Sequence, residues 1–380
     1  MSGGPGIVGV GETPALRHPE PGCDTAMLIA RAVRLALDDA GLRPADVDGL
    51  GLASFTLRPD RAIDMAWRLG LTLGWCMQDE MGGASAINLL RHAWLALRAG
   101  QARTIVLVAG DHFAGADFAE LVGRYNRSAQ DYLSPLGCAG PNPLFAMLTQ
   151  RQMAQTGLRR EDYGALCVAQ RAWAGANPNA AYRQPLTLAQ YLEAPLVAAP
   201  LGRLDCVPVV SGACALVLQA RPQGVHVALR ASGARYNDDQ QEGDGLVTGI
   251  AGFAPALWAE AGLGPQDMDV IGVYDDYPAM AVAQLCDLGL APADDLAGFI
   301  ARRIATRELA VNTAGGQLSA GQAGTAGGMH GLAEVARQLL GRAGARQVAG
   351  ARHGVATGYG MVQLRYGMCA NAAVLAREGA

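Results

Sequence analysis

The same twelve-residue pattern occurs twice in the chain, once in each half. Residues 40–51 read Ala-Gly-Leu-Arg-Pro-Ala-Asp-Val-Asp-Gly-Leu-Gly, and residues 261–272 read Ala-Gly-Leu-Gly-Pro-Gln-Asp-Met-Asp-Val-Ile-Gly. The alanine, first glycine, first leucine, proline, both aspartates and last glycine agree at one constant offset. Each copy follows a helical pattern and precedes a short apolar run, so each is expected to close a helix and open a strand. The chain is therefore predicted to be a duplication, with halves at residues 1–223 and 224–380.

Helical and strand patterns alternate in the first half, which predicts a layered α/β fold. Residues 25–40 and 82–100 show helical spacing, and Thr104–Ala109 is an apolar run that is expected to be a strand buried on both faces. Between about residues 114 and 200 the alternation gives way to aromatic residues, Asn-Pro pairs and short helical stretches. We expect this segment to be a subdomain inserted over the first layer, covering a pocket.

Residues 311–331 are rich in glycine and alanine and almost free of bulky or charged side chains. Glycine is used where the backbone takes a positive φ or where a ligand approaches the main chain closely. The stretch lies between an apolar strand and the helical pattern of residues 332–340, whereas flexible linkers are polar and rich in glycine and serine. It is predicted to be a loop packed around a ligand.

This stretch resembles the Asn-x-x-Gly-Gly…Gly-His-Pro…Gly-Ala-x-Gly loop of the thiolase superfamily. The matching residues are Asn312, Gly315, Gly316, Gly321, Gly324, Gly327 and Gly328. Together with the duplication, the resemblance covers nearly the whole chain. It implies the thiolase fold, an α/β fold of five αβαβα layers in which loops from both halves meet at the active site. It also implies a homodimer that pairs through Thr104–Ala109.

Despite this resemblance, the chain lacks the reactive side chains of a thiolase. A thiolase has a nucleophilic cysteine at a helix N-terminus, where main-chain N–H groups and the helix dipole stabilise the thiolate. It also has a histidine and a second cysteine that act as acid and base. By alignment these three positions are Gly83, Gln322 and Ala356 in this chain. Any base used here must therefore come from another residue.

One candidate base is Tyr274, in the strand-end sequence Tyr274-Asp275-Asp276-Tyr277. It matches the tyrosine in the Tyr-Asp-x-Phe motif of the lipid-transfer-protein-like aldolases of steroid side-chain breakdown, which use tyrosine for proton transfer. Those aldolases have a second tyrosine where this chain has Gln322, so this chain also departs from them. Gln322 can hydrogen-bond a thioester or a water but cannot take a proton. Asp275 or Asp276 is expected to cap or hydrogen-bond the active-site loops.

Main-chain groups are expected to bind the thioester oxygen. The glycine turn that contains Gly83 and a second turn at residues 358–360 would offer N–H groups to an oxyanion. The residues assigned to this substrate-binding set are Gly83, Ser85, Asp275, Asn312, Gly358, Tyr359 and Gly360.

Further candidates for the missing reactive groups are Cys138, Ser85 and His330. Cys138 lies in the inserted segment and is the first candidate for a displaced nucleophile, although buried cysteines are more often inert. Ser85 has no evident partner base, and His330 falls within the helix after the glycine-rich stretch, where a structural role is the simpler interpretation.

Composition excludes several other mechanisms. The chain has no lysine, so neither a Schiff base with a carbonyl substrate nor a P-loop can form. Its eight cysteines form no CxxC pair, which argues against disulfides and against metal ligation by cysteine. The net charge of −4 gives no reason to expect nucleic acid binding, and no apolar run is as long as a membrane span. We expect a cytoplasmic protein with no metal and no covalently bound cofactor.

The leading hypothesis is retro-aldol cleavage of a β-hydroxyacyl-CoA, with coenzyme A present as part of the substrate. The reaction needs a base and an oxyanion site but no acyl-enzyme. One alternative is a two-component thiolase that cleaves a β-ketoacyl-CoA with free CoA through Cys138. Another is a catalytically inactive acyl-CoA-binding subunit. Proteins of this kind often act with a small partner that carries a zinc ribbon and an OB fold, which implies a heterotetramer.

Overall fold

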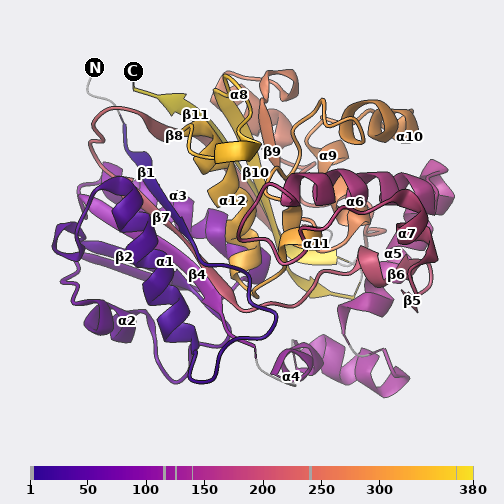
Figure 1. Cartoon of the computed structure of the whole chain (residues 1–380), viewed down its shortest axis with the longest axis horizontal. Coiled ribbons are helices and arrows are strands. Elements are labelled where there is room, and N and C mark those ends of the chain that lie inside the picture. Colours follow the sequence, from indigo (N-terminus) through magenta and orange to yellow (C-terminus); the bar gives the residue numbers. More distant parts are fainter. Residues whose placement is uncertain are drawn as a thin grey trace.

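The computed structural model describes residues 4–113, 117–124, 126–138, 140–238, 242–364 and 366–379. Within these ranges the main element is a nine-stranded mixed sheet with the order β3-β2-β4-β7-β1-β8-β11-β10-β9 (Figure 1). Its strands are β1 Gly6–Glu12, β2 Gly49–Ala53, β3 Trp75–Asp79, β4 Thr104–Asp111, β7 Gly212–Gln219, β8 His226–Tyr236, β9 Val270–Gly272, β10 His353–Gln363 and β11 Tyr366–Glu378. The two halves of the sheet meet where β1 pairs with β8 at Ile7 and Val227. A separate hairpin consists of β5 Leu196–Ala198 and β6 Leu201–Gly202.

Helices cover both half-sheets and also fill the space between them. The α-helices are α1 Thr25–Ala40, α2 Ala62–Leu69, α3 Ser85–Arg98, α4 Asp117–Gly123, α5 Pro141–Thr156, α6 Arg160–Ala174, α7 Leu188–Glu193, α8 Ala254–Ala261, α9 Pro278–Asp287, α10 Leu296–Phe299, α11 Gly316–Ala320 and α12 Ala326–Leu339. Helices α1 and α2 pack on the outer face of the first half-sheet, and α8 and α9 pack on the outer face of the second. Helices α3 and α12 lie between the half-sheets. The predicted five αβαβα layers are therefore confirmed.

Strands of both halves are buried on two faces, as an apolar run without alternation predicts. In β4, Ile105 and Leu107 face the central helices, whereas Val106 and Val108 face α1 and α2. In β11, Ala373 faces the central layer and its neighbour Val374 faces the outer one. The strands of each half-sheet thus pack against an outer helical layer on one face and against the central helices on the other.

The repeated sequence pattern forms the same structure in both halves. Gly41 ends α1 and Gly262 ends α8, each at a left-handed φ of 66°. This conformation is the usual helix end and favours glycine. A short 3-10 turn follows in each copy, at Pro44–Asp46 and Pro265–Asp267, and then a strand begins. The division at residues 223 and 224 falls between β7 and β8 and stays a prediction.

The inserted segment packs mainly on the second half, not over the first layer as the sequence suggested. Its aromatic and aliphatic residues share one core with α8 and α9, and Phe145 of α5 stacks on Tyr277 beside α9 with 4.2 Å between ring centroids. Figure 1 shows α6 beside α9 and α11, and α5 also contacts α9. The expected starting point of the insertion, residue 114, lies outside the described residues.

Two further expectations need correction. The strand Thr104–Ala109 cannot extend the sheet across a dimer axis, because β4 already pairs with β2 on one side and with β7 on the other. In the described part of the chain, the free edge of the first half-sheet is β3. The glycine-rich stretch is not one loop either, since residues 316–320 form α11 and residues 326–331 begin α12. No described helix combines the length and the apolar character that a membrane span needs.

Candidate active site

A cavity of about 510 Å³ lies where the two halves meet the inserted segment. The first half contributes the turn at Gly82–Ala84 that begins α3, and the second half contributes the loop after β9 and part of β10. Most of the other lining residues are apolar and come from the insertion. The lining residues that the sequence singled out are Gly83, Cys138, Tyr274, Gln322, Tyr359 and Gly360.

The ring of Tyr274 occupies the space beside Gly83. A Cβ atom at position 83 would lie 2.2 Å from Cε2 of Tyr274 and 2.4 Å from the main-chain oxygen of Tyr359. No real side chain tolerates such distances. A cysteine at position 83 and this tyrosine ring therefore exclude one another, which gives a physical reason for the missing nucleophile.

Tyr274 and Gln322 form a hydrogen-bonded pair at the cavity wall. The Gln322 Nε2–H donates to the Tyr274 hydroxyl at 2.9 Å. The main chain of Tyr274 is fixed as well, because its N–H donates to Thr357 Oγ1 at 2.9 Å and its carbonyl accepts from Gln284 Nε2 at 2.6 Å. An amide that donates to a phenol oxygen stabilises the charge that develops there when the phenol gives up its proton. The pair is thus arranged to donate a proton or hydrogen bond through Tyr274.

Asp275, the residue after this tyrosine, has a structural role. Its carboxylate accepts from the main-chain N–H groups of Gln317 at 2.9 Å and Leu318 at 3.4 Å, and from Gln170 Nε2 at 2.9 Å. It therefore caps α11 and ties the glycine-rich stretch to the strand end. Burial raises the pKa of Asp275 to about 7, against the lowering effect of these hydrogen bonds.

Asp276 differs from its neighbour in that it lines the cavity. It is 8% exposed, and its Oδ1 atom has no hydrogen-bond partner among the described residues. Burial, and then the charge of Asp275, raise the pKa of Asp276 to about 8. The sequence predicts only a capping or hydrogen-bonding role for Asp275 or Asp276, although a second acidic residue at a strand end beside Tyr274 is a signal for acid–base chemistry.

The other predicted site residues lie around the cavity rather than in its lining. Gly358 is part of β10 instead of a turn, and its main chain packs closely on Gly83, whose oxygen a Cβ at position 358 would approach to 2.8 Å. Ser85 is fully buried in the first turn of α3. Asn312 has a left-handed φ of 52° and borders a separate space of about 10 Å³ that His330 also borders.

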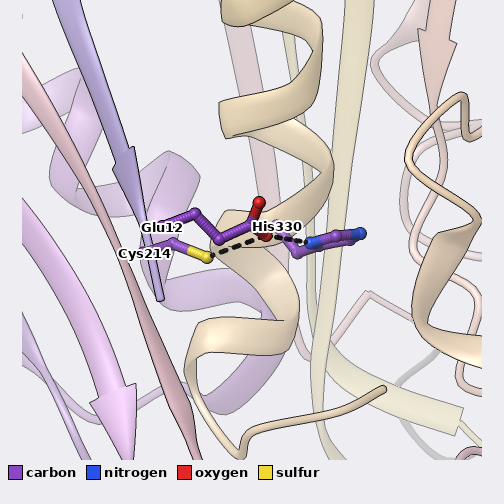
Figure 2. Close-up of side chains that lie close together, drawn as sticks. All are labelled: Glu12, Cys214 and His330. Atoms are coloured by element: carbon purple, nitrogen blue, oxygen red, sulfur yellow. Dashed lines mark hydrogen bonds and ion pairs between the residues drawn. The ribbon is translucent and has the colours of Figure 1, made fainter. Parts of the chain in front are cut away.

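His330 belongs to a buried ion-pair network away from this cavity. Figure 2 shows Glu12 of β1 between Cys214 of β7 and His330 of α12. His330 Nδ1 lies 2.7 Å from one Glu12 oxygen, and Arg337 lies 3.5 Å from the other. Burial opposes the charge, but the charge and hydrogen bond of Glu12 raise the pKa of His330, so the pair is held in its charged form.

Donor atoms of Glu12, Cys214 and His330 lie within 4.8 Å of one another, and among the described residues they form the group that could hold a metal ion. The present arrangement balances the Glu12 charge with a histidine and an arginine, and burial raises the pKa of the Cys214 thiol well above its ordinary value. A metal ion would have to displace protons from His330 or Cys214. These contacts fit an ion pair that joins β1 to α12, and the absence of a metal stays a prediction.

Comparison with known proteins identifies close relatives of this chain. Residues 231–375 match the thiolase C-terminal domain-like family. The chain is 33% identical to a 17-hydroxy-3-oxo-4-pregnene-20-carboxyl-CoA lyase of Mycobacterium tuberculosis, over 94% of this chain and 96% of the relative. It is 31% identical to a steroid side-chain-cleaving aldolase of Thermomonospora curvata, over 90% and 91%. The solved structure of an Ltp2-ChsH2(DUF35) aldolase matches 99% of this chain and 98% of that chain, with a TM-score of 0.83 and 26% identity.

Proposed function

The chain belongs to the thiolase superfamily, in the branch that contains steroid side-chain-cleaving aldolases, and on that premise we propose that it cleaves a β-hydroxyacyl-CoA by a retro-aldol reaction. The observation that carries this proposal is the Tyr274 ring packed against Gly83. It leaves no space for a cysteine at the position of the thiolase nucleophile. The reaction must then proceed without an acyl-enzyme at this position, as a retro-aldol cleavage does.

The compound in the name of the Mycobacterium tuberculosis relative has the functional groups that such a reaction needs. Its hydroxyl at C17 is β to the thioester carbonyl, and C20 is the α-carbon. Cleavage between C17 and C20 would give a ketone and a three-carbon acyl-CoA. The cavity of about 510 Å³, with Phe55, Phe118 and Val197 in its wall, supports a substrate with a bulky apolar group on the β-carbon.

In this proposal Tyr274 and Gln322 act as one unit. The Tyr274 hydroxyl, polarised by the Gln322 amide, donates to an oxygen of the reacting group. Main-chain N–H groups around Gly83 and Gly360, which border the same cavity, would bind the thioester oxygen as it becomes an enolate. Preorganised donors of this kind act on charge that develops only in the transition state, so they accelerate the reaction rather than only bind the substrate.

We also propose a small partner protein for this chain. The solved relative is named as a two-component assembly with a DUF35 protein, which supports a partner with a zinc ribbon and an OB fold. A homodimer stays a proposal too, with β3, an edge strand of the described sheet, rather than β4 as the strand that could pair between copies. The cytoplasmic location remains an expectation from the sequence.

The test is turnover of 17-hydroxy-3-oxo-4-pregnene-20-carboxyl-CoA by the chain co-expressed with a DUF35 partner. We expect equal amounts of a C17 ketone and propionyl-CoA, with no free CoA added. Product formation that strictly requires free CoA would contradict the aldolase. Binding of the thioester without turnover would instead identify an inactive acyl-CoA-binding subunit.

One observation favours the thiolase alternative, because Cys138 is a free thiol that lines the same cavity. It is half-buried, and its Sγ lies 3.9 Å from the carbonyl oxygen of Leu136. A two-component thiolase could use this thiol as a displaced nucleophile. The two functions therefore differ in what they require of position 138.

Cys138→Ser is expected to keep kcat within about twofold, because the proposed reaction has no step at a thiol and the substitution is nearly isosteric. The measurement is ketone release from the same substrate by wild type and variant. Cys286→Ser serves as the matched control, since that thiol is also partly buried but does not line the cavity. Loss of turnover in Cys138→Ser alone would favour the displaced nucleophile.

A further inference from the structure

We propose that the Asp276 carboxylate is the base that accepts the β-hydroxyl proton of the substrate. The inference rests on the proposed function and deepens it. Tyr274 and Gln322 account for hydrogen-bond donation at the cavity wall, but a retro-aldol reaction also needs a group that takes a proton from the hydroxyl. Gln322 cannot do so, because an amide has no basic lone pair at neutral pH.

The position of Asp276 fits a base. It lies two residues after Tyr274 in the loop between β9 and α9, and it lines the cavity together with that tyrosine. It is 8% exposed, and Oδ1 has no hydrogen-bond partner in the part of the chain that the structure describes. A buried carboxylate oxygen without a donor is costly, and such groups cluster at functional sites. A substrate hydroxyl in the cavity would supply the missing donor.

The neighbouring Asp275 is less suited to act as the base than Asp276. Both residues are buried carboxyls in the same loop. Asp275 accepts hydrogen bonds from two main-chain N–H groups and from Gln170, so its oxygens are engaged in holding α11. Asp275 is also not among the residues that line the cavity. Only one of the two carboxyls therefore faces the space that a substrate would fill.

The other polar groups around the cavity are less suited to take a proton. Tyr277 donates its phenolic proton to Asn142 Oδ1 at 2.5 Å, and burial raises its pKa well above the ordinary value. Burial also raises the pKa of the Cys206 thiol to about 11. Arg203 is the cation of the lining and donates to the main-chain oxygen of Cys206 at 3.2 Å.

Three more titratable groups complete the set that faces the cavity. They are Tyr274, Tyr359 and Cys138, and the Tyr359 hydroxyl accepts from the main-chain N–H of Gly367. Within the described residues, Asp276 is thus the one carboxyl of the lining. Its environment also suits the task, because burial and the charge of Asp275 raise the pKa of Asp276 to about 8. A base whose pKa lies near the working pH is both available and strong enough to take the proton.

The step balances without any further reactant. The hydroxyl proton passes to Asp276 Oδ1, and the electron pair of the O–H bond forms the new C=O bond of the ketone. The electron pair of the broken C–C bond passes to the α-carbon and is shared with the thioester oxygen as an enolate. The proton held by Asp276 then passes to the α-carbon, so that acyl-CoA and ketone are formed and the carboxylate is restored.

The test compares wild type with Asp276→Asn, which removes the basic oxygen and keeps the shape of the side chain. The kcat for ketone release from 17-hydroxy-3-oxo-4-pregnene-20-carboxyl-CoA is measured against pH, in the complex with the DUF35 partner. In wild type, kcat is expected to rise with pH through about 8, because only the deprotonated carboxyl of Asp276 is active. Asp276→Asn is expected to lower kcat by ~10²–10⁴-fold and to abolish this rise.

Asp287→Asn is the matched control. Burial raises the pKa of Asp287 to about 6, but this carboxyl accepts from the main-chain N–H of Thr248 at 2.6 Å and does not line the cavity. Its variant is expected to keep the pH dependence of wild type. Thermal unfolding verifies that each variant is folded, and Asp276→Ser replaces Asp276→Asn if the latter does not fold.

The outcomes separate the two proposals. Turnover by wild type with an unchanged kcat and pH profile in the Asp276 variant would overturn the role of Asp276 and leave the aldolase intact. Retention of the rise near pH 8 in Asp276→Asn, even with a lowered kcat, would also overturn it, because another group would then be titrating. No turnover by wild type, with and without free CoA, would contradict the proposed function itself.

Discussion

Tyr274→Phe is expected to lower kcat by ~10²–10³-fold, the range typical of losing one preorganised hydrogen-bond donor that acts on charge developing in the transition state. The substitution leaves the ring beside Gly83 in place and removes only the oxygen that accepts from Gln322 Nε2 at 2.9 Å. The fold should therefore be kept while the donor at the cavity wall is lost. Single-turnover measurement of ketone release separates this effect from slow product release.

Tyr163→Phe is the matched control for this experiment. Tyr163 is as buried as Tyr274 and donates to Gln152 Oε1 at 2.7 Å, but it does not line the cavity. Losing its hydrogen bond should cost about 1 kcal/mol of stability and leave kcat unchanged. If Tyr274→Phe retained the kcat of wild type, Tyr274 would have no part in the chemistry, and the proposed site would need another donor.

Gly83→Ala is expected to have an effect of similar size through packing. The added methyl group would lie 2.2 Å from the Tyr274 ring and 2.4 Å from the main-chain oxygen of Tyr359. The second contact involves β10, which is paired with β11, so the backbone cannot move away without breaking the sheet. We expect the ring to be displaced, stability to fall by ~1–3 kcal/mol, and kcat to fall by about 10²-fold because the reacting groups are misplaced.

The measurements for Gly83→Ala are the midpoint of denaturant unfolding and kcat. Gly123→Ala is the control, because a Cβ at Gly123, the last residue of α4, would meet no atom within 4 Å. That variant should be as stable as wild type or slightly more stable. A Gly83→Ala protein with the stability and kcat of wild type would show that the Tyr274 ring does not occupy this position in solution.

Much of the fold could be predicted from local sequence patterns. Residues 25–40 form a helix with the predicted bounds, capped by Asp24, whose Oδ1 accepts from the main-chain N–H of Met27 at 2.7 Å. The duplicated pattern predicts the two helix ends correctly, because Gly41 and Gly262 have the left-handed backbone conformation that favours glycine over other residues. Such signals are contained within a few residues, so one sequence suffices to find them.

Other features depend on contacts between distant segments. Nothing local to β4 indicates that it lies between two strands rather than at an edge, because its partner in β7 is more than a hundred residues away. Residues 316–320 are only five residues long and lie between Gly315 and Gly321, so they are too short to be a stable helix alone, and their helix is supported by the Asp275 cap from another element. His330 pairs with Glu12, which is 318 positions away. Its place in the core could not be read from its neighbours in sequence.

In the candidate site, too, the sequence identified some residues, whereas the contacts between them depend on the fold. Alignment of one loop was enough to single out Gln322, and a strand-end motif was enough to single out Tyr274. That these two side chains touch is a result of the fold, since they come from different loops. Asp275 and Asp276 are chemically identical neighbours in the sequence. Only the structure shows that one caps α11 and the other lines the cavity.

In the proposed reaction a carbon–carbon bond breaks while the original thioester stays intact. The most direct test follows 17-hydroxy-3-oxo-4-pregnene-20-carboxyl-CoA during turnover in the presence of isotope-labelled free CoA, with mass analysis of the propionyl-CoA formed. A retro-aldol reaction predicts propionyl-CoA that carries only the unlabelled CoA of the substrate, at a rate independent of the added CoA. Labelled CoA in the acyl product during turnover would show that an acyl group had been transferred to free CoA, and would contradict the retro-aldol reaction.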